Sequence, residues 1–406
     1  MHNTLDRSHG AHGGHVTDAR LRQSRLNLRT ITSALVVAAL LLSAASCAGS
    51  SAKSSTAKKP PAPRDLYIIN AKTGEVTQNF PDTDTENSSV VFAAVADGSG
   101  GWYIGGSFSR IGDVSRNGLA RLKSDGSLDT EFAPPLPRYA GVGSIVRHGN
   151  VVYVGGGEFG AGIPNGVAAF DARSGKKLWQ VSTGKEGLVG IDALAFASGT
   201  LFVGGAFTKV AGVPRDGIAA LDPRTGKPTP WNVRLISGDG KSVAGVNQMS
   251  SSNGVIYFTG WFGLVNGVKR NLSIAAVSAR TGQVTAWNPQ PSSNEPSYFI
   301  GILATHGQVL VGGKDGFASY DARTGRVLPW PEHLEYGATV FAASGNTVYL
   351  GELYDGGLFS VSGKRVRNLA AIVLPSGRGT NWRPMLSPAP EVRAVAVSGQ
   401  NVLVAG

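Results

Sequence analysis

Cysteine and histidine are scarce in this chain of 406 residues. The one cysteine, Cys47, has no second cysteine to pair with, so burial of apolar surface must stabilise the fold in place of disulfides. Four of the seven histidines lie within the first fifteen residues. The other three, His148, His306 and His333, fall at unrelated places in the sequence. This distribution argues against a catalytic or metal site built from histidine.

Long apolar runs are also absent from the N-terminal region, where a membrane-spanning helix would need about 20 apolar residues. The apolar stretch Ile31–Leu42 is too short for that; it follows an arginine-rich segment and precedes the small residues Ser43 to Ser46. A basic, then apolar, then small-residue order predicts a secretory signal peptide over residues 1–46. The histidine-rich stretch from His2 to His15 would be discarded with it, and no twin-arginine pair is present.

Cys47 directly follows Ala44-Ala45-Ser46. This stretch resembles the lipobox of bacterial lipoproteins, whose cysteine is diacylated and becomes the mature N-terminus, although the lipobox usually has leucine where this chain has Ala44. The resemblance implies that Cys47 is the lipidation site and that the protein is extracytoplasmic and anchored to the bacterial membrane. The alternative is an ordinary secretory signal followed by an incidental cysteine.

Residues 47–64 form the second predicted segment. They are rich in Ser, Ala, Lys and Pro, a composition typical of a flexible tether. The first 46 residues hold five basic and two acidic side chains, so the net charge of +11 falls to about +8 in the mature chain. The protein therefore stays basic after export.

From residue 65 to residue 406 one pattern recurs seven times: a short apolar strand ending in glycine, a loop, a second strand and a tight glycine turn. The turn glycines lie 52, 49, 51, 56, 43 and 52 residues apart. They are Gly74, Gly126, Gly175, Gly226, Gly282, Gly325 and Gly377. A period near 50 made of short strands predicts an all-β, seven-bladed β-propeller with four strands, A to D, in each blade. A solenoid would need atypical capping repeats, which the sequence does not show.

The two ends of the repeat region complement each other. Val392–Val397 and Val402–Val404 have the pattern of strands A and B with nothing after them. Leu66–Asn70 and the turn at Gly74 have the pattern of strands C and D with nothing before them. We therefore expect the N-terminal strands C and D to pair with the C-terminal strands A and B, which closes the ring and removes exposed sheet edges.

Two stretches carry family resemblances. Asp125 to Phe132, DGSLDTEF, resembles the delta-60 repeat of bacterial secreted proteins, and Ala169 to Trp179, AFDARSGKKLW, resembles the tryptophan-docking motif of pyrroloquinoline quinone propellers. The second resemblance implies that each tryptophan packs against the neighbouring blade. Quinone dehydrogenases of that family hold their cofactor over a disulfide between adjacent cysteines, which a chain with Cys47 alone cannot form. No cofactor is therefore expected.

Two further patterns have some features of ligand-binding loops. Asp82, Asp84 and Glu86 alternate in one loop but lack the glycine and the downstream glutamate of a calcium loop. Ser237 to Ser242, SGDGKS, lacks the spacing of a phosphate-binding loop. We interpret the first as a solvated acidic loop and the second as an ordinary turn, and we predict no metal site.

An Arg-Asn or Arg-Asp pair precedes strand C in four repeats. Structurally, the Asn or Asp would set the turn while the arginine packs its stem or binds nearby carbonyl groups. Functionally, the arginines would form an anion-binding face. They are Arg116, Arg215, Arg270 and Arg367.

No nucleophile or carboxylate pair stands out, so the sequence favours a non-enzymatic binding scaffold in the cell envelope. The expected partners are the membrane, through the lipid anchor, and an unknown envelope protein, anionic polymer or glycan; nucleic acid is not expected. The alternative is a glycan-binding protein or a glycan-active enzyme with its site at the mouth of the propeller channel.

Overall fold

The computed structural model describes most of the repeat region, and all described residues belong to one unit, Pro61–Gly406. The described ranges are 66–79, 89–137, 140–156, 165–184, 190–270, 272–290, 299–313, 316–330, 338–353, 358–361, 364–386 and 391–406. Within them every regular element is a strand, and none forms a helix able to cross a membrane. The fold is all-β, as predicted.

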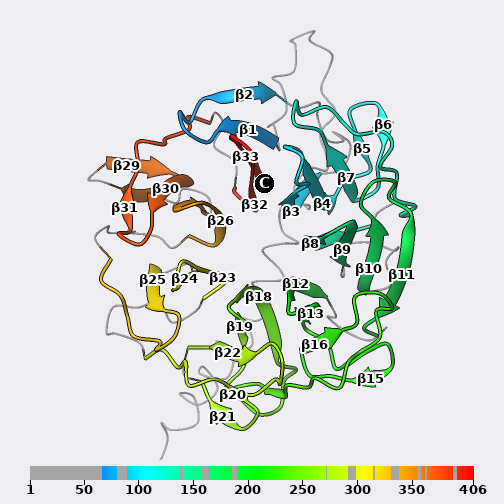
Figure 1. Ribbon diagram of the computed structural model, residues 1–406, viewed down its shortest axis with the longest axis vertical. Helices are drawn as coiled ribbons and strands as arrows, with labels where there is room; N and C mark the ends of the chain where they lie inside the picture. The colour runs from blue at the N-terminus through cyan, green and yellow to red at the C-terminus, as the bar shows by residue number, and fades with distance from the viewer. Residues whose placement is uncertain are drawn as a thin grey trace, which may run out of the picture. The chain divides into compact units, whose positions relative to one another are not determined.

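Seven described sheets share the antiparallel order A–B–C, with strand A innermost in Figure 1. They are β3(Val90–Ala96), β4(Trp102–Ser107), β7(Leu119–Leu122); β8(Val142–His148), β9(Val151–Gly156), β10(Gly166–Asp171), β11(Lys177–Ser182); β12(Ile191–Ala197), β13(Thr200–Gly205), β16(Ile218–Leu221); β18(Gly245–Ser252), β19(Val255–Trp261), β22(Ile274–Ser278); β23(Gly301–Thr305), β24(Gln308–Gly313), β25(Gly316–Asp321); β26(Val340–Ser344), β27(Thr347–Gly351), β30(Leu369–Val373), β31(Arg378–Gly379); and β32(Ala394–Ser398), β33(Asn401–Ala405), β1(Leu66–Asn70), β2(Val76–Asn79). We number them repeats 1 to 7 in this order.

The B–C connections form small two-stranded ribbons in several repeats. These are β5(Arg110–Ile111) with β6(Val114–Ser115), β14(Lys209–Val210) with β15(Val213–Pro214), β20(Leu264–Val265) with β21(Val268–Lys269), and β28(Leu358–Val361) with β29(Lys364–Arg367). The ribbon of repeat 4 also pairs with β17(Leu235–Ile236), which follows repeat 3. This one ribbon therefore links repeats 3 and 4.

The prediction of four regular strands in every repeat is wrong for repeats 1, 3, 4 and 5. There the described D segment makes a single bridge to strand C, as between Leu221 and Pro228. In repeat 3 the segment contains Pro228 and Pro230, which have no N–H to donate to a ladder. Each of these D segments still donates a backbone N–H to strand C, as Thr229 does to the Ala220 carbonyl at 2.8 Å.

The core lies between the sheets. Each of seven clusters of buried apolar residues joins two consecutive repeats, and one of them joins repeat 7 to repeat 1. In β13, Leu201 and Val203 pack towards repeat 2, whereas Phe202 between them packs towards repeat 4. Both faces of the strand are therefore buried, which explains why the strands are continuous apolar runs.

The paired glycines at the end of strand B allow two close approaches. A Cβ on Gly205 would lie 2.0 Å from the carbonyl oxygen of Gly190, where the chain enters strand A of the same repeat. A Cβ on Gly204 would lie 2.7 Å from Val246 on strand A of the next repeat. Gly204 therefore makes room for the neighbouring sheet, and Gly205 makes room for the backbone at the start of strand A in its own sheet.

Tyrosine and tryptophan side chains fasten repeats 1, 2, 3, 4 and 6 to the C–D turn of the next repeat, whereas Trp330 Nε1 of repeat 5 has no hydrogen-bond partner among the described residues. Trp287 Nε1 donates to the Asp321 carbonyl at 3.0 Å, and Tyr257 Oη donates to the Ala322 carbonyl at 2.7 Å. Equivalent bonds run from Trp179 and Tyr153 to Pro223, from Trp231 to Ser278, from Tyr103 to Ala172, and from Trp382 and Tyr349 to Asn70 and Ala71. The implied docking of the tryptophans is confirmed for these repeats; the tyrosine partners were not anticipated.

The innermost strands follow one another around a centre (Figure 1). Neighbours in contact are β3 with β8, β8 with β12, β12 with β18, β18 with β23, β23 with β26, β26 with β32, and β32 with β3. In repeat 7, β1 pairs with β33 from Leu66 opposite Ala405 to Asn70 opposite Asn401. Trp102 Nε1 of repeat 1 also donates to the Ala396 carbonyl of repeat 7 at 3.2 Å.

Candidate interaction surfaces

Three of the predicted arginines tie the B–C ribbon to the D segment of the same repeat. Arg215 donates from Nη1 to the Pro214 carbonyl at 2.7 Å and from Nη2 to the Thr229 carbonyl at 2.8 Å. Arg116 and Arg270 repeat this geometry with Thr130 and Thr285 as the D-segment acceptors. These contacts match the structural interpretation of the arginines, in which each one binds nearby carbonyl groups.

Burial disfavours the charged form of two of these side chains. Arg270 is 5% exposed, and burial lowers the pKa of its guanidinium. Burial likewise lowers the pKa of Arg116, partly offset by the charge of Asp129. Arg367 differs, because it ends β29 and is exposed. The anion-binding role of the four arginines stays a prediction, and three of them already use both Nη atoms within the fold.

Several predicted features lie outside the described residues. They are the signal and tether segments with Cys47, the acidic loop with Asp82, Asp84 and Glu86, and the partner residue Asn271 of Arg270. His333, Glu332 and Glu335 are also outside them. Within the described part of the chain, no three His, Cys, Asp or Glu side chains gather in a way that could hold a metal ion.

The SGDGKS stretch folds around its own aspartate. Asp239 accepts hydrogen bonds from the hydroxyls of Ser237 and Ser242 and from the backbone N–H groups of Lys241 and Ser242. The hydroxyl of Ser237 contributes most to lowering the pKa of this carboxyl group. Because the loop amides donate to a carboxylate of the loop itself, they are not available to a phosphate.

The ribbons expose apolar side chains at equivalent positions. Val114, Val213 and Val268 follow the ribbon turns of repeats 1, 3 and 4, and they are 37%, 38% and 44% exposed. We call these three residues the ribbon valines. The turn residues alone can hold such a two-stranded ribbon together. The local fold therefore does not require an exposed valine in each of the three ribbons.

Bulges near the start of several innermost strands place further side chains at the ribbon end of the sheets. The register of β12 shifts at Asp192, which is exposed, and that of β18 shifts at Asn247. Just before β32, Arg393 donates to Glu391 at 2.6 Å and lies over the ring of Phe92, which occupies the bulge of β3. The described starts of these innermost strands thus carry charged and polar residues together with the aromatic ring of Phe92.

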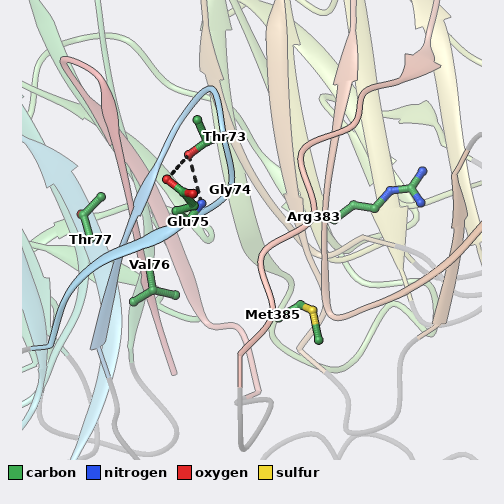
Figure 2. Close-up of a pocket in the computed structure, with 7 residues that line it drawn as sticks. All are labelled: Thr73, Gly74, Glu75, Val76, Thr77, Arg383 and Met385. Carbon is green, nitrogen blue, oxygen red and sulfur yellow. Dashed lines mark hydrogen bonds between the residues drawn. The ribbon is translucent and has the colours of Figure 1, made fainter.

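One open groove of about 730 Å³ lies between repeats 6 and 7 (Figure 2). It is lined by the β1–β2 turn, Thr73 to Thr77, and by Arg383 and Met385. Figure 2 shows the Arg383 side chain directed away from that turn, where Thr73 bonds Glu75. The acidic and basic residues of the groove therefore do not converge on a common point.

Comparisons with known proteins agree with the fold. A family model described as a domain of unknown function (DUF5122) beta-propeller matches residues 99–132, and one described as outer membrane protein assembly factor BamB matches residues 164–301. Neither match spans half of the chain, and no curated protein matches it. The chain therefore carries β-propeller repeats of DUF5122 and BamB-like type, as the resemblances predicted in part.

Solved structures with a similar fold have low sequence identity. A chain of the mitotic checkpoint complex is 13% identical with a TM-score of 0.50, over 88% of this chain and 98% of that chain. BamB from Moraxella catarrhalis is 17% identical with a TM-score of 0.46, over 84% of this chain and 92% of that chain. The likeness at these identities concerns the fold alone.

Proposed function

We propose that this protein is an exported, lipid-anchored β-propeller that acts as a binding scaffold for envelope proteins. The observation that carries the proposal is the match of residues 164–301 to the repeats of an outer membrane protein assembly factor. Assembly requires contacts with other proteins, and the ribbon valines supply an exposed apolar rim for such contacts.

The scaffold is a closed ring of seven blades in this proposal. Its support is the circular order of contacts among the innermost strands, together with the pairing of β1 with β33. A closed ring keeps the ribbons of different repeats at fixed positions relative to one another. Such a rim is preorganised for binding, because little conformational entropy is lost when a partner docks.

The partner-binding role is tested by changing the ribbon valines to serine, V114S/V213S/V268S, in the mature protein. A matched control changes three equally exposed valines at the opposite end of the sheets, V76S/V327S/V373S. Crosslinking in envelope membranes, followed by identification of captured proteins and glycans, is expected to show a protein partner for the wild type and the control, and its loss in the ribbon variant. Equal capture by both variants would contradict the proposal.

Membrane attachment through Cys47 is the second part of the proposal, and its support is the resemblance of residues 44–47 to a lipobox. One acyl chain attaches a protein only marginally, whereas two hold it stably. Cys47→Ala is expected to move the protein from the membrane pellet to the soluble fraction or to block its processing. A processed variant that still pellets like the wild type would place the anchor elsewhere.

A glycan-binding protein is the second candidate, and the observation that favours it is the polar bulge residues Asp192 and Asn247 on neighbouring innermost strands. Carboxylate and amide groups suit sugar hydroxyls. Recovery of a glycan in place of a protein in the capture experiment would favour this candidate.

A further inference from the structure

A second surface lies at the end of the sheets opposite the ribbons, where the C–D turns gather. Because the strands of each sheet are antiparallel, the A–B and C–D turns share one end, and the B–C ribbons share the other. Leu66, which begins β1 opposite Ala405 at the end of strand B, lies at the ribbon end. The C–D turns are therefore at the end away from the point where the N-terminal segment enters the repeats.

Five of the seven C–D turns are built by a capping side chain and a glycine, whereas the turns at Gly126 and Gly377 have Leu122 and Val373 at the capping position. In repeat 3, Asp222 Oδ1 accepts the N–H groups of Arg224 and Thr225, and Gly226 has a φ of +69°. Asp171, Asp321, Asn70 and Ser278 cap the equivalent turns in the same way. These two positions determine the turn, so the residue two places before the glycine is free to be of any type.

That unconstrained position is basic in five of the seven repeats. The residues are Lys72, Arg173, Arg224, Arg280 and Arg323, and all of them are exposed. The position after the glycine adds four more exposed basic residues, Lys176, Lys227, Arg326 and Arg378. We call these nine residues the turn cations. Among the described residues, the one ion pair made by a turn cation joins Arg173 to Glu131 at 3.9 Å, between two exposed side chains.

Negative charge on these turns is largely engaged. The carboxylates of Asp171, Asp222 and Asp321 accept the backbone N–H groups of their own turns. Asp97, at the A–B turn of repeat 1, is buried and paired with Arg121 at 2.7 Å. The described A–B turns carry no lysine or arginine, and the exposed carboxylates Glu75 and Asp125 on the C–D turns of repeats 7 and 1 offset only part of the positive charge of the nine turn cations.

The turns that carry the cations are held in place by the preceding repeat. Pro223, beside Arg224, accepts hydrogen bonds from Trp179 and Tyr153, and Asp321 and Ala322, beside Arg323, accept them from Trp287 and Tyr257. The positive charges are therefore fixed on successive repeats around the ring, while no described cavity gathers them to one point.

We propose that the turn cations bind a linear anionic polymer whose phosphate or carboxylate groups repeat along its length. Spaced cations do not converge on a single small anion, but a polymer that passes from turn to turn can neutralise several of them and release its counterions. Guanidinium groups bind both phosphate and carboxylate oxygens. The cellular source of the polymer depends on the proposed location in the envelope, but the binding of the polymer to the turn cations does not.

The test compares the mature wild-type chain with two variants of equal charge change. R173Q/R224Q/R280Q/R323Q removes turn cations, whereas K209Q/R234Q/K241Q/K269Q removes exposed basic residues near the ribbon end. Binding to long-chain polyphosphate and to polygalacturonate is measured at low and physiological salt, with inorganic phosphate, neutral dextran and anionic vesicles as further probes. Thermal melting of each variant shows that it is folded.

We expect the turn variant to lose at least about tenfold in affinity for one or both polymers, and the control variant to lose less than about threefold, with affinity falling as salt rises. Preference for one polymer identifies phosphate or carboxylate as the ligand group. Equal losses in both variants, tighter binding to vesicles than to either polymer, or binding of inorganic phosphate as tight as that of polyphosphate would overturn the proposal. The variants leave Cys47 and the ribbon valines unchanged, so the scaffold proposal can fail independently.

Discussion

Asp97 shows how single residues stabilise the sheets from their turns. Its carboxylate accepts the N–H groups of Ser99 and Gly101 and is paired with Arg121, which also reaches Asp129 at 3.2 Å. Burial disfavours the charged form of Asp97, but hydrogen bonds from Ser99, Arg121 and Gly101 outweigh it and lower the pKa below its ordinary value of 3.8. Arg121 on strand C thus joins Asp97 in the A–B turn to Asp129 in the D segment of repeat 1.

The contribution of Asp97 to stability should depend on pH. Because its pKa is lowered in the folded state, the contribution is full above the ordinary pKa and is lost as the pH falls through the lowered one. Asp97→Asn should reduce the free energy of unfolding by about 1–3 kcal/mol at pH 7, and the difference from wild type should shrink below about pH 4. Urea unfolding at several pH values measures this, with the exposed Asp113→Asn as control. A difference that does not change with pH would refute the assignment.

At the scale of the elements, the hairpin of β1 and β2 supplies two of the four strands of repeat 7. Without it, one edge of β33 would be unpaired, and the residues of repeat 6 that dock on Asn70 and Ala71 would lose their acceptors. The hairpin is short, but it is hydrogen-bonded both to β33 of its own sheet and to the Trp382 and Tyr349 side chains of repeat 6.

Removing residues 65–80 should therefore greatly lower the melting temperature or cause aggregation. Removing residues 52–61 from the tether should leave the melting temperature nearly unchanged, because that segment has a linker composition. Differential scanning calorimetry of the two deletions makes the comparison. Equal melting temperatures would mean that the pairing of β1 with β33 does not determine stability.

The strand pattern was predictable from the sequence, because short apolar runs and turn glycines are local signals. The end of strand B at Gly205 and the turn at Gly226 both lie where the repeat pattern places them. The irregular D segments were not predictable, because a proline such as Pro228 is compatible both with a regular strand at the sheet edge and with a segment that makes a single bridge. Nor were the partners of Tyr257 or Arg215, because the repeat shows that these residues recur but not which carbonyl groups accept their hydrogen bonds.

At the scale of the whole molecule, stability is distributed over interfaces. Each apolar cluster belongs to two repeats, so no repeat can bury its own apolar residues without its neighbours. The ribbon end carries the exposed valines, and the opposite end carries the turn cations. These two surfaces are separated by the length of the strands, so the proposed polypeptide partner and the proposed anionic polymer would not compete for the same surface.

The pairing of β1 with β33 also has a consequence for the order in which the chain can mature. Leu66 and Ala405 are neighbours in the sheet although more than three hundred residues separate them. During synthesis, β1 is made before the other strands of the repeats, and its partner strand is made last. Strand β1 must therefore remain without its partner until nearly the whole chain has been synthesised. Contacts between residues so far apart in the sequence form slowly. Until β33 is made, the edge of β1 that faces it in the folded protein lacks its partner and is open to pairing with other chains.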